Sequence, residues 1–122
     1  MLKYDENILR VAIASDHAGY KLKEKLKSII AEEGFKVIDL GADSETSVDY
    51  PDFGFALADT IKQGKAERGI AVCGSGIGIS IAVNRHKGIR AALCSDLDAV
   101  VISRKHNNAN VLAIGARNTN LI

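Results

Sequence analysis

The sequence predicts an α/β protein: a doubly wound, Rossmann-like or flavodoxin-like fold in three layers, α/β/α, around a five-stranded parallel sheet. Short apolar segments alternate with amphipathic segments along the whole chain, and each apolar segment is followed by glycine or small polar residues. Strands that alternate with helices form βαβ units, whose right-handed crossovers place helices on both faces of a parallel sheet. Among folds of this kind, five strands favour the order 2-1-3-4-5.

Each element is predicted from its own pattern. Five apolar segments are predicted as strands: residues 8–14, 35–40, 69–73, 89–93 and 110–114. Four helices are predicted between them: residues 18–33, 51–63, 79–84 and 96–105. The first helix places its leucines and isoleucines on one face and its lysines, including Lys23, off that face. Gly34 ends this helix, Pro51 begins the second, and Ser95 with Asp98 has the spacing of a capping box before the fourth.

The totals predict a single domain, residues 1–122, because 122 residues suffice for one domain and not for two. The 16 Lys and Arg residues barely exceed the 15 Asp and Glu residues, so binding to nucleic acid or to an anionic membrane is not expected. No apolar run approaches the roughly 20 residues of a membrane helix. The two cysteines fit no metal or redox spacing and suit a reducing compartment, so we expect a cytoplasmic protein.

The segment most informative about function is Cys73 with the glycine-dense turn 74–78 behind it. The turn does not match the dinucleotide fingerprint, because Ile79 stands where the third glycine belongs, and it lacks the Gly-Lys-Ser/Thr of a Walker loop. Backbone N–H groups at a helix N-terminus could hold an oxyanion or a phosphate, and the helix dipole favours a thiolate that acts as base or nucleophile. The alternative is a buried structural cysteine before a tight turn. Three glycines in five residues favour a ligand site.

Other polar residues follow the predicted strands. Asp16 and His17 follow the first strand and Arg117 follows the fifth. Ligands of such sheets bind beyond the carboxyl ends of the strands, so we expect these residues to meet Cys73 at one edge. There Asp16 could move protons, and His17 and Arg117 could bind a phosphate. The alternatives are a helix cap for Asp16 and solvent-exposed side chains for the other two.

Two further residues have competing interpretations. His106 follows the last helix, where it could be a cation favoured by the helix dipole or an acid/base group at the same edge. Cys94 also follows a strand, but no glycine turn comes after it, so a structural role is favoured. No carboxylate pair and no His/Cys cluster indicates a metal, so no metal site is expected.

Several short motifs occur in a fixed order along nearly the whole chain. They are Ser-Asp-His-Ala-Gly at 15–19 with Leu-Lys at 22–23, Val-Asp-Tyr-Pro-Asp at 48–52, Cys-Gly-Ser-Gly-Ile-Gly-Ile-Ser at 73–80, Gly-Ile-Arg-Ala-Ala at 88–92, and His-Asn-Asn-Ala-Asn-Val-Leu at 106–112 with Gly-Ala-Arg at 115–117. Together these motifs resemble the type B ribose-5-phosphate isomerases, a family shared with the galactose-6-phosphate isomerase subunits. The presence of all these motifs in this order indicates the family far more specifically than any single motif does.

The resemblance implies an aldose–ketose isomerase of the pentose phosphate pathway. Such an enzyme interconverts ribose 5-phosphate and ribulose 5-phosphate through an enediolate, without a metal or organic cofactor. Cys73 matches the base that carries the proton between C1 and C2, and Ser75 with the backbone of 74–78 matches the cradle for the enediolate. His106, with Asp16, matches the groups that assist opening of the sugar ring.

The same resemblance implies the substrate contacts. They are His17, Tyr50, Gly74, Gly76, Ile77, Gly78, Asn107 and Arg117. His17 and Arg117 match phosphate contacts, Tyr50 lines the sugar site, and Asn107 contacts sugar oxygens. Relatives are homodimers or homotetramers with sites at the subunit interface, so His106, Asn107 and Arg117 are expected to serve the site of a neighbouring chain.

The sequence departs from the family pattern at two places. Asn108 stands where many relatives carry Asp, and the relatives continue past the position of Ile122 into a helix and a basic tail with phosphate-binding arginines. We therefore expect weaker phosphate binding and uncovered apolar surface on one face of the sheet. Two alternatives remain open: an isomerase of another phosphosugar, such as allose or galactose 6-phosphate, and a non-catalytic module that binds a phosphorylated ligand.

Overall fold

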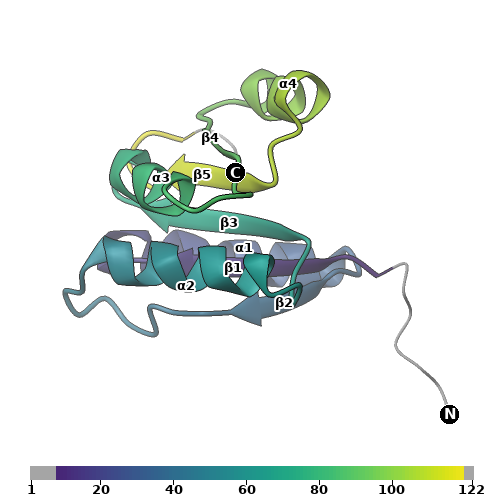
Figure 1. Ribbon diagram of the computed structural model, residues 1–122. Coiled ribbons are helices and arrows are strands. Elements are labelled where there is room, and N and C mark those ends of the chain that lie inside the picture. The colour runs from purple at the N-terminus through teal and green to yellow at the C-terminus, as the bar shows by residue number, and fades with distance from the viewer. Residues whose placement is uncertain (1–7, 120–122) are drawn as a thin grey trace, which may run out of the picture.

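The computed structural model describes residues 8–119 and contains a five-stranded sheet in which every strand pair is parallel (Figure 1). The strands are β1 (Arg10–Ser15), β2 (Lys36–Asp39), β3 (Arg68–Cys73), β4 (Ala91–Leu93) and β5 (Val111–Gly115). Helices α2 and α3 pack together on one face of the sheet, and α1 and α4 flank the other face. The predicted fold class is confirmed.

The observed strand order is β2-β1-β3-β5-β4, so the predicted order 2-1-3-4-5 is wrong in its last two positions. Strand β5 pairs with β3 on one side and with β4 on the other. It is buried along most of its length, whereas β4 has three residues and leaves Leu93 45% exposed. An interior parallel strand must be apolar on both faces, so the more apolar segment takes the interior place.

Capping residues and glycines mark the ends of several helices. The 3-10 helix η1 (His17–Gly19) leads into α1 (Tyr20–Glu32), and the remaining helices are α2 (Tyr50–Lys62), α3 (Ile77–Asn84) and α4 (Leu97–Asn107). Gly34, with φ +95°, directly follows the C-cap of α1, as predicted. The predicted cap of α4 is wrong, because Asp96 rather than Ser95 caps it: its Oδ1 accepts from the Ala99 N–H at 2.8 Å.

Close packing fixes α2 and α3 against the sheet and against each other. A Cβ atom at Gly54 of α2 would lie 3.0 Å from the Cβ of Ala82 of α3, so the two helices approach closely at this glycine. Leu57 and Ile79 are fully buried between the helices and the strands. This packing sets where α3 begins, and therefore where the turn that joins it to β3 lies.

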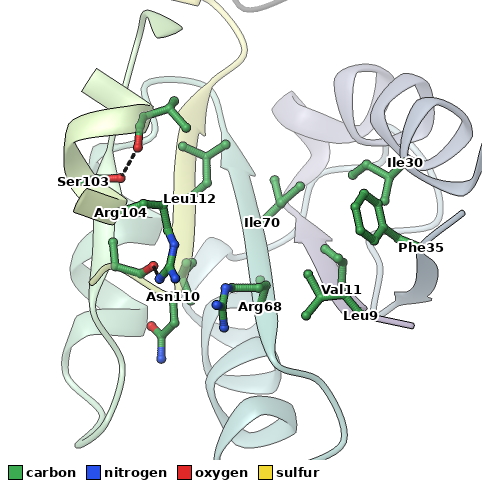
Figure 2. A pocket seen from close by; sticks show the side chains of 14 residues that line it. Leu9, Val11, Ile30, Phe35, Arg68, Ile70, Ser103, Arg104, Asn110 and Leu112 are labelled. Atoms are coloured by element: carbon green, nitrogen blue, oxygen red, sulfur yellow. Dashed lines mark hydrogen bonds between the residues drawn. The ribbon is translucent and has the colours of Figure 1, made fainter. Parts of the chain in front are cut away.

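The other face of the sheet carries a groove between α1 and α4 (Figure 2). Its volume is about 260 Å³; Ile70 and Leu112 lie along its floor, with Phe35 on one side and Arg104 on the other. The groove lies over the face of the sheet rather than at the carboxyl ends of the strands. Within residues 8–119, no helix combines the length and apolar character needed to cross a membrane.

Candidate active site

Parallel pairing brings the carboxyl ends of the strands to one edge of the sheet. Ser15 of β1 is in register with Val72 of β3, and Cys73 is in register with Gly115 of β5. The segments that leave these strands therefore emerge side by side. They carry Asp16 and His17, then Cys73 and the turn 74–78, and then Arg117.

Cys73 is a buried thiol whose sulfur is contacted by the turn behind it. The residue is 4% exposed, and its Sγ accepts a hydrogen bond from the Gly76 N–H at 3.1 Å. Gly76 has φ +80°, and a Cβ atom there would lie 2.7 Å from the backbone nitrogen of Gly115. Only glycine allows this path, which folds the turn back over the sulfur. The turn therefore places a hydrogen-bond donor directly against the sulfur.

The turn 74–78 also presents the N-terminus of α3. The Ser75 hydroxyl oxygen accepts from the Ile77 N–H at 3.1 Å, so this side chain stays at the first turn of the helix. Ile77 itself is 53% exposed. The first N–H groups of a helix have no partner within it, and they form an electropositive surface beside the Cys73 sulfur.

Two side chains lie directly against the glycines of this turn. A Cβ atom at Gly74 would lie 2.5 Å from Nη1 of Arg117, whose backbone N–H donates to the Gly74 oxygen at 3.0 Å. A Cβ atom at Gly78 would lie 2.7 Å from Cζ of Tyr50. The structure therefore places a guanidinium and a phenol on either side of the turn. Both belong to the same chain as Cys73.

Asp16 and His17 lie beside this turn at the end of β1. Asp16 is buried, and its Oδ1 accepts from the Gly19 N–H at 3.0 Å, which confirms that it caps η1. Its backbone N–H donates to the Val72 oxygen at 3.1 Å, next to Cys73. The half-buried His17 has Nδ1 3.0 Å from the Val48 nitrogen. When Nδ1 accepts from that N–H, the ring proton is on Nε2 and can be donated to a ligand.

His106 and Asn107 do not lie at this edge. Helix α4 begins just past the carboxyl end of β4 and runs back along the sheet, so its last residues lie near the amino ends of the strands. The Asn107 oxygen accepts from Arg90 Nε at 2.7 Å, and Arg90 directly precedes β4. His106 is exposed there. The expectation that His106 reaches the same edge as Cys73 is therefore wrong within a single chain.

Asn108, the departure from the family pattern, has a local structural role. It is the C-cap of α4 in the left-handed conformation, with φ 51°. Its side-chain oxygen accepts from Arg104 Nη1 at 3.1 Å. Asparagine is among the residues that tolerate this conformation best, so it suits the end of this helix.

Sequence patterns missed one buried charge near the site. Lys23 was predicted to lie off the buried face of its helix, but it is completely buried. Its partner Asp39 lies in the next strand, so helical periodicity alone could not reveal the pairing. Among the described residues, no three His, Cys, Asp or Glu side chains are grouped so that they could hold a metal ion.

Comparison with known proteins identifies the family. The family model for ribose/galactose isomerases matches residues 11–121. The chain belongs to this family. A curated relative, ribose-5-phosphate isomerase B of Escherichia coli, is 42% identical over 108 residues, which cover 88% of this chain and 72% of the relative. The D-erythrulose-4-phosphate isomerase of Pectobacterium atrosepticum is 43% identical over 112 residues, with 90% and 73% covered.

A solved structure of a family member has the same fold. Ribose-5-phosphate isomerase B of Clostridium thermocellum superimposes with a TM-score of 0.91 at 47% identity, covering 93% of this chain and 76% of that one. The family resemblance found in the sequence motifs is thus confirmed.

Proposed function

We propose that the chain is an aldose–ketose isomerase that interconverts ribose 5-phosphate and ribulose 5-phosphate through an enediolate. The observation that carries this proposal is the Cys73 sulfur, held by the Gly76 N–H beside the N-terminus of α3. Isomerisation of a sugar needs a base near a carbon-bound proton and donors for the oxyanion that develops. A thiolate beside the N–H groups at the N-terminus of α3 supplies both.

In this proposal Cys73 removes the proton from C2 of the open-chain aldose. The electron pair of that bond forms the C1–C2 double bond, and the negative charge moves to O1, where N–H groups of the turn 74–78 stabilise it. Cys73 then returns the proton to C1. The hydroxyl hydrogen of C2 passes to O1, so that C2 becomes the carbonyl of the ketose.

The neighbouring side chains are assigned to binding and ring opening. His17 through Nε2 and Arg117 through its guanidinium bind the phosphate, and Tyr50 lines the sugar site. Asp16 assists ring opening together with His106. Arg117 is close enough to Gly74 to serve the site of its own chain.

We further propose that the active form is a homodimer or a homotetramer of such pairs. His106 and Asn107 lie at the opposite end of the sheet from Cys73, so they can serve a site only in a second copy. Exposed large apolar side chains on α3, β4 and α4 support such a contact: Ile77, Ile81, Leu93, Leu97 and Ile102. A two-fold axis perpendicular to the strands would bring opposite ends of two sheets together. The two buried free cysteines support a reducing, cytoplasmic location.

The test of the reaction is turnover by this chain. The rate of ribulose 5-phosphate formation from ribose 5-phosphate is compared with rates on D-erythrulose 4-phosphate, allose 6-phosphate and galactose 6-phosphate. The four-carbon sugar is included because one relative named for it is 43% identical to this chain. The highest kcat/KM on ribose 5-phosphate supports the proposal, and a preference for another sugar overturns the assigned substrate. Binding without turnover of any sugar favours the phospho-ligand-binding module.

The shared site is tested by mixing two inactive variants, Cys73→Ala and His106→Asn. If His106 serves the neighbouring copy, a mixed dimer contains one intact site and one doubly altered site. Random reassociation then restores about a quarter of the wild-type activity, because half of the dimers are mixed and each has one intact site. If both residues act within one chain, mixing restores no activity.

A further inference from the structure

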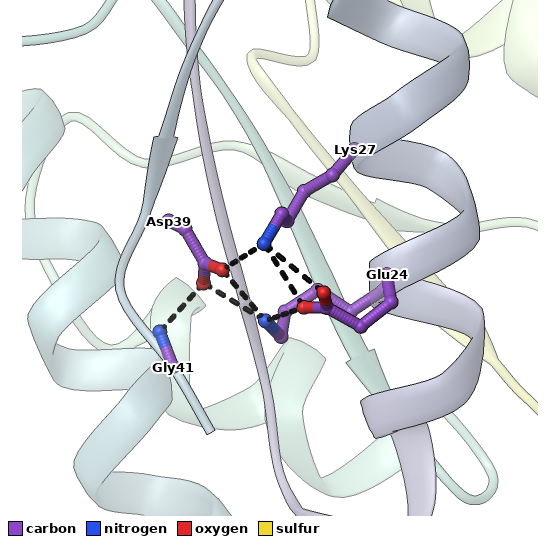
Figure 3. Close-up of polar contacts among 5 residues, drawn as sticks. Glu24, Lys27, Asp39 and Gly41 are labelled. Atoms are coloured by element: carbon purple, nitrogen blue, oxygen red, sulfur yellow. Dashed lines mark hydrogen bonds and ion pairs between the residues drawn. The ribbon is translucent and has the colours of Figure 1, made fainter. Parts of the chain in front are cut away.

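A cluster of ion pairs around the buried Lys23 joins α1 to the end of β2, and its other members are partly exposed (Figure 3). Lys23 is completely buried, and its Nζ donates to both carboxylate oxygens of Asp39 at 2.9 Å and to Glu24 Oε2 at 2.7 Å. Lys27 is partly exposed and bridges the same two carboxylates. A buried ammonium group is costly without such partners, so the position of Lys23 is tied to theirs.

The cluster is balanced in charge. Burial by itself would raise the pKa of Asp39, but hydrogen bonds from Lys27 and Lys23 outweigh it and hold that pKa below its usual value. Hydrogen bonds from Lys23 and then Lys27 also lower the pKa of Glu24. Both carboxylates are therefore ionised at neutral pH, and two positive charges face two negative ones.

The cluster continues by hydrogen bonds to the edge of the sheet that carries the site. Asp39 Oδ1 accepts from the Gly41 N–H at 2.9 Å. The Gly41 oxygen in turn accepts from the Ser15 N–H at 2.7 Å, and the Ala42 N–H donates to the Ser15 oxygen at 2.8 Å. Ser15 directly precedes Asp16. Asp39, which Lys23 binds, thus contacts Gly41, and Gly41 in turn contacts Ser15 at the start of the loop that carries Asp16 and His17.

We propose that Lys23 is a positioning residue for the isomerase site. By fixing Asp39 it keeps Gly41 against Ser15. That contact sets where Asp16 and His17 lie relative to the Cys73 turn. This inference rests on the proposed function, because Asp16 and His17 are assigned there to ring opening and phosphate binding.

Lys27 provides a matched control within the same cluster. It carries the same charge and contacts Glu24 and Asp39, but on Asp39 it reaches only Oδ2. Lys23 also contacts Oδ1, the oxygen that accepts from Gly41. If the cluster only attaches α1 to β2, neither substitution changes kcat/KM or the surroundings of His17 while the protein is folded. If Lys23 positions the site, the two substitutions differ.

The experiment compares Lys23→Met and Lys27→Met with the wild type on ribose 5-phosphate, below the melting temperature of every variant. We expect Lys23→Met to lower kcat/KM by about tenfold, mostly through KM, because small displacements of binding groups have effects of this size or larger. Lys27→Met is expected to change kcat/KM by less than about twofold, as is usual for a partly exposed ion pair. Equal losses in the two variants would overturn the proposal.

A second readout is independent of turnover. The ring signals of His17 in NMR spectra report its tautomer and surroundings, and they are expected to shift in Lys23→Met and to stay in place in Lys27→Met. If the wild type does not isomerise ribose 5-phosphate, the proposed function fails, and these signals still decide whether Lys23 positions the loop. Unchanged His17 signals in Lys23→Met contradict the positioning role.

A second pair of variants covers the case in which Lys23→Met does not fold. Asp39→Asn keeps an oxygen that can accept from the Gly41 N–H, whereas Asp39→Ala removes it. Both lose the ion pairs with the two lysines. We expect Asp39→Asn to retain several-fold more kcat/KM than Asp39→Ala, and a smaller shift of the His17 signals. Equal effects of the two changes overturn the proposal.

Discussion

A cysteine lies at the end of β3 and another lies at the end of β4, but the two have different surroundings. Cys73 ends β3 and Cys94 follows β4, and both are buried free thiols at the carboxyl edge of the sheet. The Cys73 sulfur receives an N–H hydrogen bond from Gly76 at 3.1 Å. The Cys94 sulfur lies 3.7 Å from the Ala92 carbonyl oxygen, and burial, with a smaller contribution from the charge of Asp96, raises the pKa of its thiol.

The difference comes from the residues that follow each strand. After β3 the chain makes a glycine-rich turn in which the Gly76 N–H donates to the sulfur. After β4 it enters α4 through Asp96, whose carboxylate takes the helix cap and leaves a negative charge near the thiol. Position at a strand end therefore does not by itself determine the surroundings of a cysteine. The residues that follow the strand determine which groups lie around the sulfur.

The largest effect is expected from Cys73→Ala. Removal of the proposed base should lower kcat by about a thousandfold, within the range for a general base, while phosphosugar binding remains because the turn is intact. Isomerase assays and calorimetric titration with ribose 5-phosphate measure the two quantities. Cys94→Ala is the control, and it should retain wild-type kcat. Substantial turnover by Cys73→Ala in a preparation free of wild type would remove Cys73 from the mechanism.

The second prediction concerns the path of the turn. Gly76→Ala combines a strained φ with a clash against the backbone of Gly115, and we expect it to lower the free energy of unfolding by about 2–4 kcal/mol. Gly88 also has positive φ, +89°, but its Cβ would meet no heavy atom within 4 Å. Gly88→Ala should therefore cost only about 1 kcal/mol. Denaturant unfolding measures both, and equal losses would show that the backbone contact contributes nothing.

A third, more moderate effect is expected from Arg117→Ala, which tests the proposed role of Arg117 in binding the phosphate. Loss of the guanidinium beside Gly74 should raise KM for ribose 5-phosphate by about tenfold with kcat within about twofold. Arg85→Ala removes an exposed arginine just past the far end of α3 and serves as control. A fall in kcat at unchanged KM would instead assign Arg117 to the chemical step.

Local features of the fold and site were predictable from the sequence. Alternating apolar and amphipathic segments predicted the elements and the parallel sheet, and the glycine density after Cys73 marked the turn correctly. Short-range contacts form this turn, so a short stretch of sequence contains the information. The cap of α4 was missed by one residue because Ser95 and Asp96 are both good caps, and only the path of the chain selects between them.

Features that depend on distant pairing were not predictable. The place of β5 between β3 and β4 depends on competition between two apolar segments for an interior position. Helix α4 joins the parallel strands β4 and β5 and therefore runs back along the sheet, which carries His106 to the opposite end. The burial of Lys23 depends on Asp39, which lies 16 residues later in another element. The periodicity of one helix cannot predict a partner that lies in another element.

The smallest expected effect is a pH dependence of folding stability that arises from the Cys94 thiol. Because burial raises its pKa, the folded state retains the proton at pH values where the unfolded chain has lost it. Stability should therefore fall as pH rises above the usual pKa of cysteine, about 8.5, since the folded state then binds more protons. Denaturant unfolding of Cys73→Ala, with and without Cys94→Ala, isolates this dependence. The decline should be weaker when Cys94 is absent, and identical pH profiles would contradict the raised pKa.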